Sequence, residues 1–345
     1  MLDRGDGILT VSGLTKRFDA SNPWILRLLS QEPRRIVHAV EDVSFEIGRG
    51  TTFALVGESG CGKSTIARCV AGILPSSAGR ITFMGADMAD RRMGAAARRR
   101  RRHLQMIFQD PYASLNPRWR VGRIIAEPIV THGLLQSRAE IDARVAELLR
   151  LVGLSAEDAR KYPHQFSGGQ WQRISIARAL ASEPDFIVCD EPTSALDVSV
   201  QAQILNLMRR LQSRLGLTYL LISHNLAVVA HMAERLGVMY LGRLVEVGDA
   251  RSIIDHPLHP YTRMLLDTIP DIEMTGRRPA PPKGEVPNPL APPAGCPYHP
   301  RCPLANSRCA QEQPRPVRVR QVLVACHAVE EGRLAAGSPA TRLTT

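Results

Sequence analysis

The chain alternates short apolar runs with longer segments in which apolar residues recur every three to four positions. The short runs have the length and composition of buried strands, and the longer segments predict helices, most of residues 119–180 and 199–215 among them. The strand-like runs occupy residues 52–56, 186–190, 218–223 and 236–247. Because strands that alternate with helices form a mainly parallel core sheet, the expected fold class is α/β.

Three segments depart from this alternation. Residues 40–47 alternate polar and apolar side chains, which predicts an edge or antiparallel strand. Residues 19–35 contain two prolines and predict a loop with a short helix. The composition shifts at Pro270, and the proline-dense stretch 277–303 favours an extended linker over a second large core.

The segment between the first core strand and the following helix has the spacing of a phosphate-binding P-loop. Its glycines let backbone N–H groups point at phosphate oxygens, and the helix N-terminus adds a positive dipole end. Lys63 can reach the β- and γ-phosphates, and the Ser64 hydroxyl can ligate Mg²⁺. The expected nucleotide-binding residues are Gly57, Glu58, Ser59, Gly60, Cys61, Gly62, Lys63, Ser64 and Thr65.

Two carboxylates follow the apolar run 186–190 at its carboxyl end. Asp190 stands where a P-loop enzyme holds Mg²⁺, usually through water, and Glu191 can polarise an attacking water. An acidic pair after a strand can also be a helix N-cap, so the P-loop upstream is what favours the catalytic interpretation.

A second anion cradle begins another predicted helix, formed by Ser167, Gly168, Gly169 and Gln170. A single nucleotide does not need two such helix termini from one chain. The arrangement is explained if the second cradle serves the nucleotide of a partner subunit.

With these motifs in this order, the chain resembles the ATPase subunits of ABC transporters. The resemblance implies a P-loop cassette with a mixed core sheet and a helical subdomain at about 115–180. It identifies the P-loop as Walker A, 167–170 as the signature and 186–190 as Walker B. The roles it implies are catalysis by Glu191, His224 and Gln109, a D-loop aspartate at Asp197, and Mg²⁺ binding by Ser64, Gln109 and Asp190.

The adenine-binding residue is open. The family usually stacks the base on an aromatic residue just after the first strand, and Phe18 matches that position. The insertion that follows could displace Phe18, in which case a residue near His38 could lie closer. Phe18 could also be ordinary strand packing.

Two further segments, 109–118 and 258–262, resemble the oligopeptide/dipeptide importer branch. Residues 58–65 and 111–117 resemble its F-type ATPase member. That branch carries a C-terminal extension. The implied division is a nucleotide-binding domain at 1–255 and an extension at 256–345, with a cysteine-rich segment at 296–326.

The resemblance implies that MgATP drives closure of an ATPase dimer and that hydrolysis reopens it, which powers import of peptides. The implied partners are a second ABC ATPase subunit in a heterodimer, two transmembrane permeases and an extracytoplasmic solute-binding protein. The cargo could instead be another small solute, such as nickel or glutathione. A nucleic-acid-associated ABC ATPase is a more distant alternative.

Charge and hydropathy place limits on these functions. The 345 residues carry a net charge of +11, partly from the run 98–102, for which a solvated helix face, a membrane surface and nucleic acid are the alternatives. Aromatic residues make up 5% of the chain and none interleaves with the run, so we expect no nucleic-acid partner. No apolar run approaches the roughly 20 residues of a membrane span. The predicted location is the cytoplasmic face of the membrane.

Four cysteines lie in the C-terminal segment, with five, six and sixteen residues between successive members: Cys296, Cys302, Cys309 and Cys326. Four thiolates can hold a [4Fe–4S] cluster or Zn²⁺, and the lack of two-residue spacings favours the cluster. The resemblance points the same way, because such cysteines can hold an iron–sulfur cluster in this branch. His299 or His327 could replace a cysteine at zinc, and free or disulfide-bonded cysteines are the remaining alternative.

Overall fold

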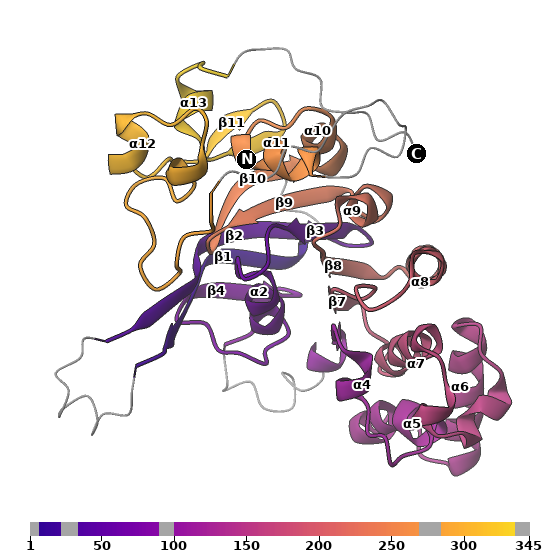
Figure 1. Cartoon of the computed structure of the whole chain (residues 1–345). Coiled ribbons are helices and arrows are strands. Elements are labelled where there is room, and N and C mark those ends of the chain that lie inside the picture. The colour runs from indigo at the N-terminus through magenta and orange to yellow at the C-terminus, as the bar shows by residue number, and fades with distance from the viewer. Residues whose placement is uncertain (1–6, 22–33, 90–99, 269–283, 335–345) are drawn as a thin grey trace.

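The computed structural model describes residues 7–21, 34–89, 100–268 and 284–334, which form two sheets flanked by helices (Figure 1). The larger sheet has eight strands in the order β11-β12-β10-β9-β3-β8-β7-β6. Its five strands from β9 to β6 run parallel, and β10, β12 and β11 continue it with antiparallel pairing. The expected α/β core with a mixed sheet is therefore confirmed.

The bounds of the large-sheet strands are β3 (Thr52–Val56), β6 (Leu104–Ile107), β7 (Phe186–Asp190), β8 (Thr218–Ile222), β9 (Arg235–Tyr240), β10 (Arg243–Asp249), β11 (Val317–Val319) and β12 (Val322–Val324). Every residue of β3, β7 and β8 is buried. Successive residues of a strand face opposite sides of the sheet. Accordingly, Phe53 and Leu55 join one hydrophobic cluster while Ala54 and Val56 join another.

The smaller sheet is antiparallel, with the order β2-β1-β4-β5. Its strands are β1 (Gly7–Asp19), β2 (Ile36–Gly48), β4 (Ala78–Phe83) and β5 (Ala86–Asp87). The predicted strand at 40–47 lies within β2, which is an edge strand paired with β1, as its alternation indicated. Apolar side chains of β1 and β2 pack with Phe53 and with helix α2 (Lys63–Val70) in one cluster.

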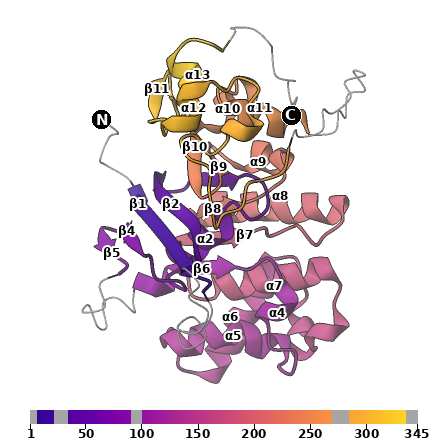
Figure 2. The ribbon, with the colours of Figure 1, turned by 60° about the vertical axis from the view of Figure 1, so that its left-hand side comes forward.

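A group of helices projects from the β6–β7 side of the large sheet (Figures 1 and 2). It contains α4 (Pro111–Ser114), α5 (Val121–His132), α6 (Arg138–Leu151) and α7 (Gly168–Leu180), with 3-10 turns at Ala156–Arg160 and Pro163–Gln165. Helix α6 begins at a capping box in which the Ser137 hydroxyl accepts from Glu140 N–H and the Glu140 carboxylate accepts from Ser137 N–H. The helical segment predicted at 119–180 is confirmed.

The remaining helices line the sheet and the tail. They are α8 (Val198–Leu215), α9 (Leu226–Met232), α10 (Ala250–Asp255), α11 (Pro260–Asp267), α12 (Ser307–Gln311) and α13 (His327–Glu330), with a 3-10 turn at His299–Arg301. Strand β12 pairs with β10, and Cys296, Tyr298 and Cys309 join the main hydrophobic cluster. The described tail is thus built onto the cassette sheet. The division at residue 255 stays a prediction.

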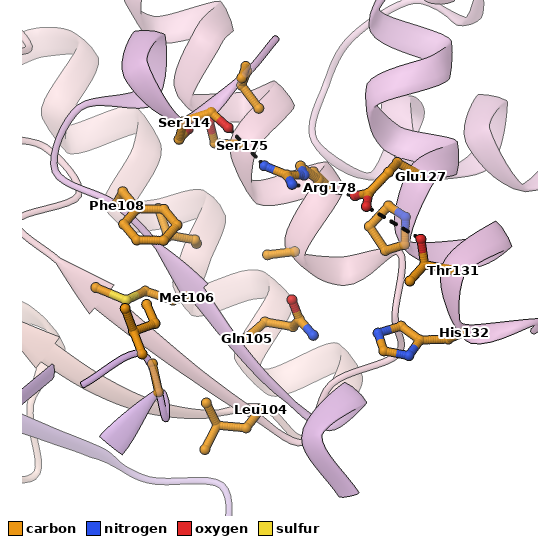
Figure 3. Close-up of a pocket in the computed structure, with 16 residues that line it drawn as sticks. Leu104, Gln105, Met106, Phe108, Ser114, Glu127, Thr131, His132, Ser175 and Arg178 are labelled. Atoms are coloured by element: carbon orange, nitrogen blue, oxygen red, sulfur yellow. Dashed lines mark hydrogen bonds and ion pairs between the residues drawn. The ribbon is translucent and has the colours of Figure 1, made fainter. Parts of the chain in front are cut away.

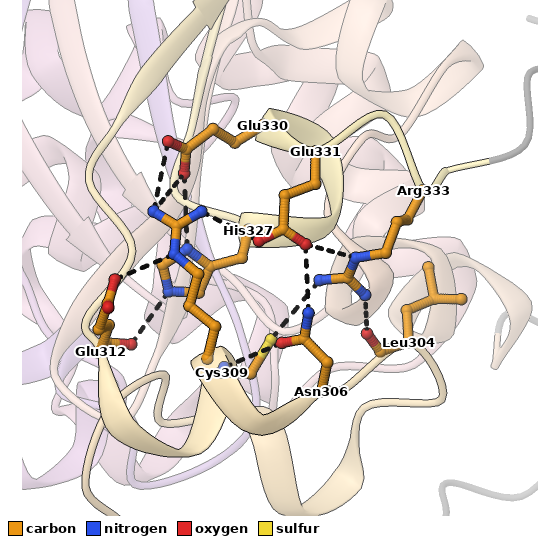
Figure 4. A network of polar contacts seen from close by, with 9 residues as sticks. Leu304, Asn306, Cys309, Glu312, His327, Glu330, Glu331 and Arg333 are labelled. Atoms are coloured by element: carbon orange, nitrogen blue, oxygen red, sulfur yellow. Dashed lines mark hydrogen bonds and ion pairs between the residues drawn. The ribbon is translucent and has the colours of Figure 1, made fainter.

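Inside the tail, Arg308 of α12 donates to Glu312 at 3.0 Å and to Glu331 at 3.0 Å, and pairs with Glu330 at 3.2 Å (Figure 4). The Arg333 guanidinium bonds the same Glu331 and the Leu304 carbonyl. These contacts link α12 to α13. They stabilise the tail, which is too short to have a large hydrophobic core of its own.

Three expectations fall wholly or partly outside the described residues. They concern most of the insertion 19–35, the first two arginines of the run 98–102, and the start of the proline-dense stretch. Within the described part of the run, Arg101 is exposed. No helix that the structure describes has the length and apolarity of a membrane span.

Candidate nucleotide-binding site

The P-loop joins the carboxyl end of β3 to the N-terminus of α2, as the sequence predicted. Gly57 has φ 152° and Gly62 has φ 107°, a region that side chains disfavour. A Cβ at Gly57 would lie 2.2 Å from the Met239 carbonyl oxygen, and one at Gly62 would lie 2.2 Å from that of Ala39. Strands β9 and β2 therefore press against the loop, and only glycine leaves room at these two positions.

Lys63 is buried at the start of α2. Its Nζ donates to the Gly57 carbonyl at 2.7 Å and to the Glu58 carbonyl at 2.9 Å. The ammonium group is held inside the curve of the loop, where a phosphate oxygen would meet it. The arrangement fits the binding of a nucleotide polyphosphate.

Ser64 and Asp190 lie together, although 126 residues separate them in the sequence. The Ser64 hydroxyl donates to Asp190 Oδ1 at 2.8 Å, and Asp190 is 2% exposed. Burial raises the pKa of the Asp190 carboxyl, and the Ser64 hydrogen bond opposes this. A hydroxyl beside a buried carboxylate fits a hard cation such as Mg²⁺.

The three predicted catalytic residues lie together, with Glu191 in contact with the other two. Gln109 Nε2 donates to Glu191 Oε2 at 3.0 Å, and His224 Nδ1 lies 3.3 Å from Glu191 Oε1. The three side chains follow β6, β7 and β8, which are adjacent parallel strands whose carboxyl ends meet at one edge. Glu191 has φ 48°, a conformation that non-glycine residues rarely adopt and that is common at functional sites.

The signature lies at the N-terminus of α7. Ser167 and Gln170 are exposed, and Gln170 Oε1 accepts from the Ser167 backbone N–H at 2.9 Å. A Cβ at Gly169 would lie 2.5 Å from Val200 Cγ1, so glycine permits contact with α8. Asp197 caps α8 by accepting from the Val200 N–H at 2.9 Å. The signature and the D-loop are therefore neighbours in one chain.

Phe18 is half-buried within β1, opposite Val37 of β2, and the Lys16 ammonium lies 4.9 Å from its ring centroid. It belongs to the strand and does not follow it. Ala39, which follows His38, also lies close to the P-loop, because a Cβ at Gly62 would lie 2.2 Å from the Ala39 carbonyl oxygen. The adenine-binding residue stays a prediction.

Two residues that sequence reasoning missed contact the P-loop. Arg301 of the tail forms a bidentate ion pair with Glu58, with N–O distances of 2.7 and 2.9 Å. The Tyr261 hydroxyl accepts a hydrogen bond from the Glu58 N–H at 2.8 Å. Arg301 lies 243 residues from Glu58, so no local pattern connects them. The burial of a tail arginine was not visible in the sequence.

The four tail cysteines are free and lie around the turn at His299–Arg301, in α12 and before α13. Burial is the main cause that raises the pKa of Cys296 to about 12, and the nearby thiols Cys326, Cys302 and Cys309 contribute to that rise, so the thiols share one neighbourhood. Even so, among the residues that the structure describes, no three His, Cys, Asp or Glu side chains converge as a metal ion requires. The side-chain positions therefore do not support the predicted metal site.

The candidate zinc-ligand histidines bond backbone carbonyls instead: His299 Nδ1 lies 2.9 Å from the Cys296 carbonyl oxygen and His327 Nε2 lies 3.0 Å from that of Glu312.

A groove of about 300 Å³ opens between β6 and the helical group (Figure 3). Exposed apolar side chains, Ile73 at 50% and Phe108 at 37%, lie on its lining. Across the groove, Arg178 donates to the Ser114 carbonyl at 2.9 Å and pairs with Glu127 at 3.4 Å. Phe108 directly precedes Gln109, so the groove adjoins the cluster of Gln109, Glu191 and His224.

The fold and these contacts define an ATP-binding cassette of the ABC type. Residues 40–194 match the ABC transporter family, and residues 245–309 match the oligopeptide/dipeptide transporter C-terminal region. The Di/tripeptide transport ATP-binding protein DppF of Pseudomonas aeruginosa is 46% identical over 94% of this chain and 98% of its own. The Oligopeptide transport ATP-binding protein OppF of Salmonella typhimurium is 46% identical over 82% and 85%.

A solved structure of similar fold is the dimeric ATP-binding cassette MJ0796 in a post-hydrolysis state with ADP and phosphate. It matches with a TM-score of 0.60 and 26% identity over 70% of this chain and 99% of that one. The chain belongs to the oligopeptide/dipeptide family of ABC transporter ATP-binding proteins, and it is an ATPase subunit of that family.

Proposed function

We propose that this chain hydrolyses MgATP to drive import of peptides through partner permeases at the cytoplasmic face of the membrane. The convergence of Gln109 and His224 on Glu191, beside the Ser64–Asp190 pair, carries the proposal. The names of the relatives, which are peptide transport proteins, support peptides as the cargo.

Each residue has a proposed part in hydrolysis. Lys63 and the loop amides hold the β- and γ-phosphates, and Ser64 with Asp190 would hold Mg²⁺, which neutralises phosphate charge. The Glu191 carboxylate would accept a proton from the attacking water. His224 and Gln109 fix the orientation of that carboxylate through their contacts with it.

The signature supports a shared site in an ATPase dimer. Ser167 and Gln170 are exposed, and α7 lies with the helical group while α2 lies against the sheet (Figures 1 and 2). A nucleotide that contacts the signature would thus come from a second subunit, and the dimeric cassette of similar fold is consistent with this. We propose a second ABC ATPase subunit as that partner, in a heterodimer.

We propose that the groove of Figure 3 receives a cytoplasmic segment of a permease. Its exposed Ile73 and Phe108 would bury apolar surface against such a segment. Movement of Phe108 would then reach Gln109 and the catalytic cluster directly. A solute-binding protein outside the membrane would deliver the cargo to the permeases.

A cysteine-held [4Fe–4S] cluster also stays a proposal, with Zn²⁺ as its alternative. The shared neighbourhood of the four thiols supports it, although their positions do not form a coordination site. Metal analysis of anaerobically purified protein tests it. About four irons per chain would support the cluster, and about one zinc per chain the alternative. Protein free of both metals would exclude both.

The function is tested by uptake of labelled peptides in cells that lack this chain. Wild-type protein should restore uptake, and Glu191→Gln, expressed to the same level, should not. Nickel and glutathione uptake, measured in parallel, tests the alternative cargoes. Restored uptake of either solute without any effect on peptides would contradict the proposed cargo. Copurification of nucleic acid in place of membrane-spanning chains would favour the nucleic-acid alternative.

A further inference from the structure

The tail reaches the P-loop through one buried arginine. Arg301 Nη1 donates to Glu58 Oε2 at 2.7 Å and Nη2 donates to Glu58 Oε1 at 2.9 Å. The Arg301 side chain is 3% exposed and that of Glu58 is 22% exposed. An ion pair at the protein surface contributes little to stability. A buried guanidinium is different, because its charge is strongly destabilising once its partner is removed.

Aromatic residues hold the arginine in place. Its guanidinium carbon lies 5.7 Å from the ring centroid of Tyr240 and 5.8 Å from that of Tyr298. The rings of Tyr240, Tyr261 and Tyr298 pack on one another with centroids 4.7 to 5.4 Å apart. Strand β9, helix α11 and the tail each supply one of these tyrosines. The guanidinium group of Arg301 is therefore held in position without a bound ligand.

Glu58 transmits this support to the nucleotide site. Its carboxylate is bound by Arg301, its N–H donates to the Tyr261 hydroxyl at 2.8 Å, and its carbonyl accepts from Lys63 Nζ at 2.9 Å. Without Arg301, an unpaired carboxylate would stand in a loop that binds polyphosphate, and it would repel the ligand. The loop would also lose one of the contacts that fix its curvature.

We propose that Arg301 is a positioning residue through which the C-terminal extension sets the affinity of the P-loop for nucleotide. The inference rests on the proposed ATP-binding role of the P-loop. In this arrangement the tail is part of the nucleotide site, because the conformation of Glu58 depends on a residue 243 positions away.

The test uses the full-length chain assembled with its permeases and partner ATPase. Arg301→Met removes the charge and keeps the apolar stem. The expected result is a KM for ATP about tenfold higher, with kcat changed less than about twofold. Arg301→Lys keeps the charge without the fork, so its KM should lie between the two. Arg308→Met is the matched control, because Arg308 pairs with glutamates inside the tail, and its KM should match wild type.

A double-mutant cycle tests whether Arg301 acts on the KM for ATP through Glu58. In a Glu58→Gln background, Arg301→Met should change KM by less than about twofold, because its partner charge is already gone. An equal change in both backgrounds, or a lower melting temperature with an unchanged KM, would overturn the proposal. So would a raised KM in Arg308→Met. An inactive wild-type assembly would instead contradict the proposed function, so the two failures are distinguishable.

Discussion

The candidate nucleotide site has a P-loop half and a signature half, and the polar side chains of the two halves have different partners. In the P-loop half, polar groups are engaged within the chain: Lys63 by loop carbonyls, Ser64 by Asp190 and Glu191 by Gln109. In the signature half, Ser167 and Gln170 are exposed and hydrogen-bond to each other. One half is held by contacts within the chain, and the other is an exposed helix N-terminus.

The two halves also have different structural support. The tail supports the P-loop through Arg301, and α11 supports it through Tyr261, whereas the signature rests on α8 through Gly169 and Val200. Under the proposed function, nucleotide affinity is set within one chain, and completion of the catalytic site depends on assembly. The predictions below separate these two contributions.

The largest effect is expected at the centre of the P-loop half. Glu191→Gln keeps the shape of the side chain and removes the base, so hydrolysis should fall about 10²- to 10⁴-fold while ATP still binds. Steady-state ATPase and equilibrium nucleotide binding measure the two quantities. Lys63→Ala is the contrasting variant, because it should weaken binding itself. Wild-type turnover by Glu191→Gln would remove this residue from catalysis.

The second prediction addresses the signature half. In the proposed shared site a nucleotide needs the signature of another subunit, so the isolated chain should hydrolyse ATP slowly. Below the dissociation constant of any self-association, the rate per chain should rise in proportion to concentration. Adding the partner ATPase and permeases should raise it further. A rate per chain that is independent of concentration and equal to that of the full assembly would show that the P-loop half suffices.

A third, smaller effect concerns Mg²⁺. Asp190 bonds Ser64 and would act on the metal from just outside its ligands, where substitutions typically weaken metal binding about 10- to 100-fold. Asp190→Asn should therefore shift the Mg²⁺ dependence of ATPase activity to higher concentration. Asp197→Asn, at the D-loop cap, is the control and should leave that dependence in place. An unchanged Mg²⁺ midpoint in Asp190→Asn would separate this carboxylate from the metal.

The smallest expected effect is on the pH dependence of stability, and it comes from two buried side chains next to α11. Burial raises the pKa of Glu246 to about 7 and lowers the pKa of His259 to about 3. Folded protein keeps a proton on Glu246 that the unfolded chain releases, so this contribution to stability falls as pH rises from 4.5 to 7. His259 stays neutral when folded, so its contribution is lost as pH falls from 6.5 towards 3.

Between pH 4.5 and 6.5 the two contributions oppose each other, so the wild-type free energy of unfolding should be nearly flat. Glu246→Gln should give a stability that rises with pH, and His259→Asn one that falls, each by about 1.4 kcal/mol per pH unit. His259→Asn keeps a side-chain acceptor for the Tyr261 N–H that now bonds Nδ1 at 3.0 Å. Urea unfolding across this range measures the slopes, and two slopes of the same sign would contradict the assignment.

The sequence by itself determined the local elements and the motifs they carry. The apolar runs at 52–56 and 186–190 became β3 and β7 because a strand buried on both faces needs continuous apolar residues. The glycines at 57 and 62 predicted a loop of unusual backbone conformation, and the loop has it. The run at 186–190 placed Glu191 at a strand end, and the family resemblance implied the roles of Gln109 and His224.

Only the tertiary structure decided the long-range contacts. Pairing of β12 with β10 joined the tail to the main sheet, which the proline-dense composition did not predict. It also brought Arg301 to Glu58, and β1 placed Phe18 within a strand opposite Val37. These outcomes depend on packing between segments up to 243 residues apart, and neither periodicity nor motif spacing records which distant side chains will share one buried space.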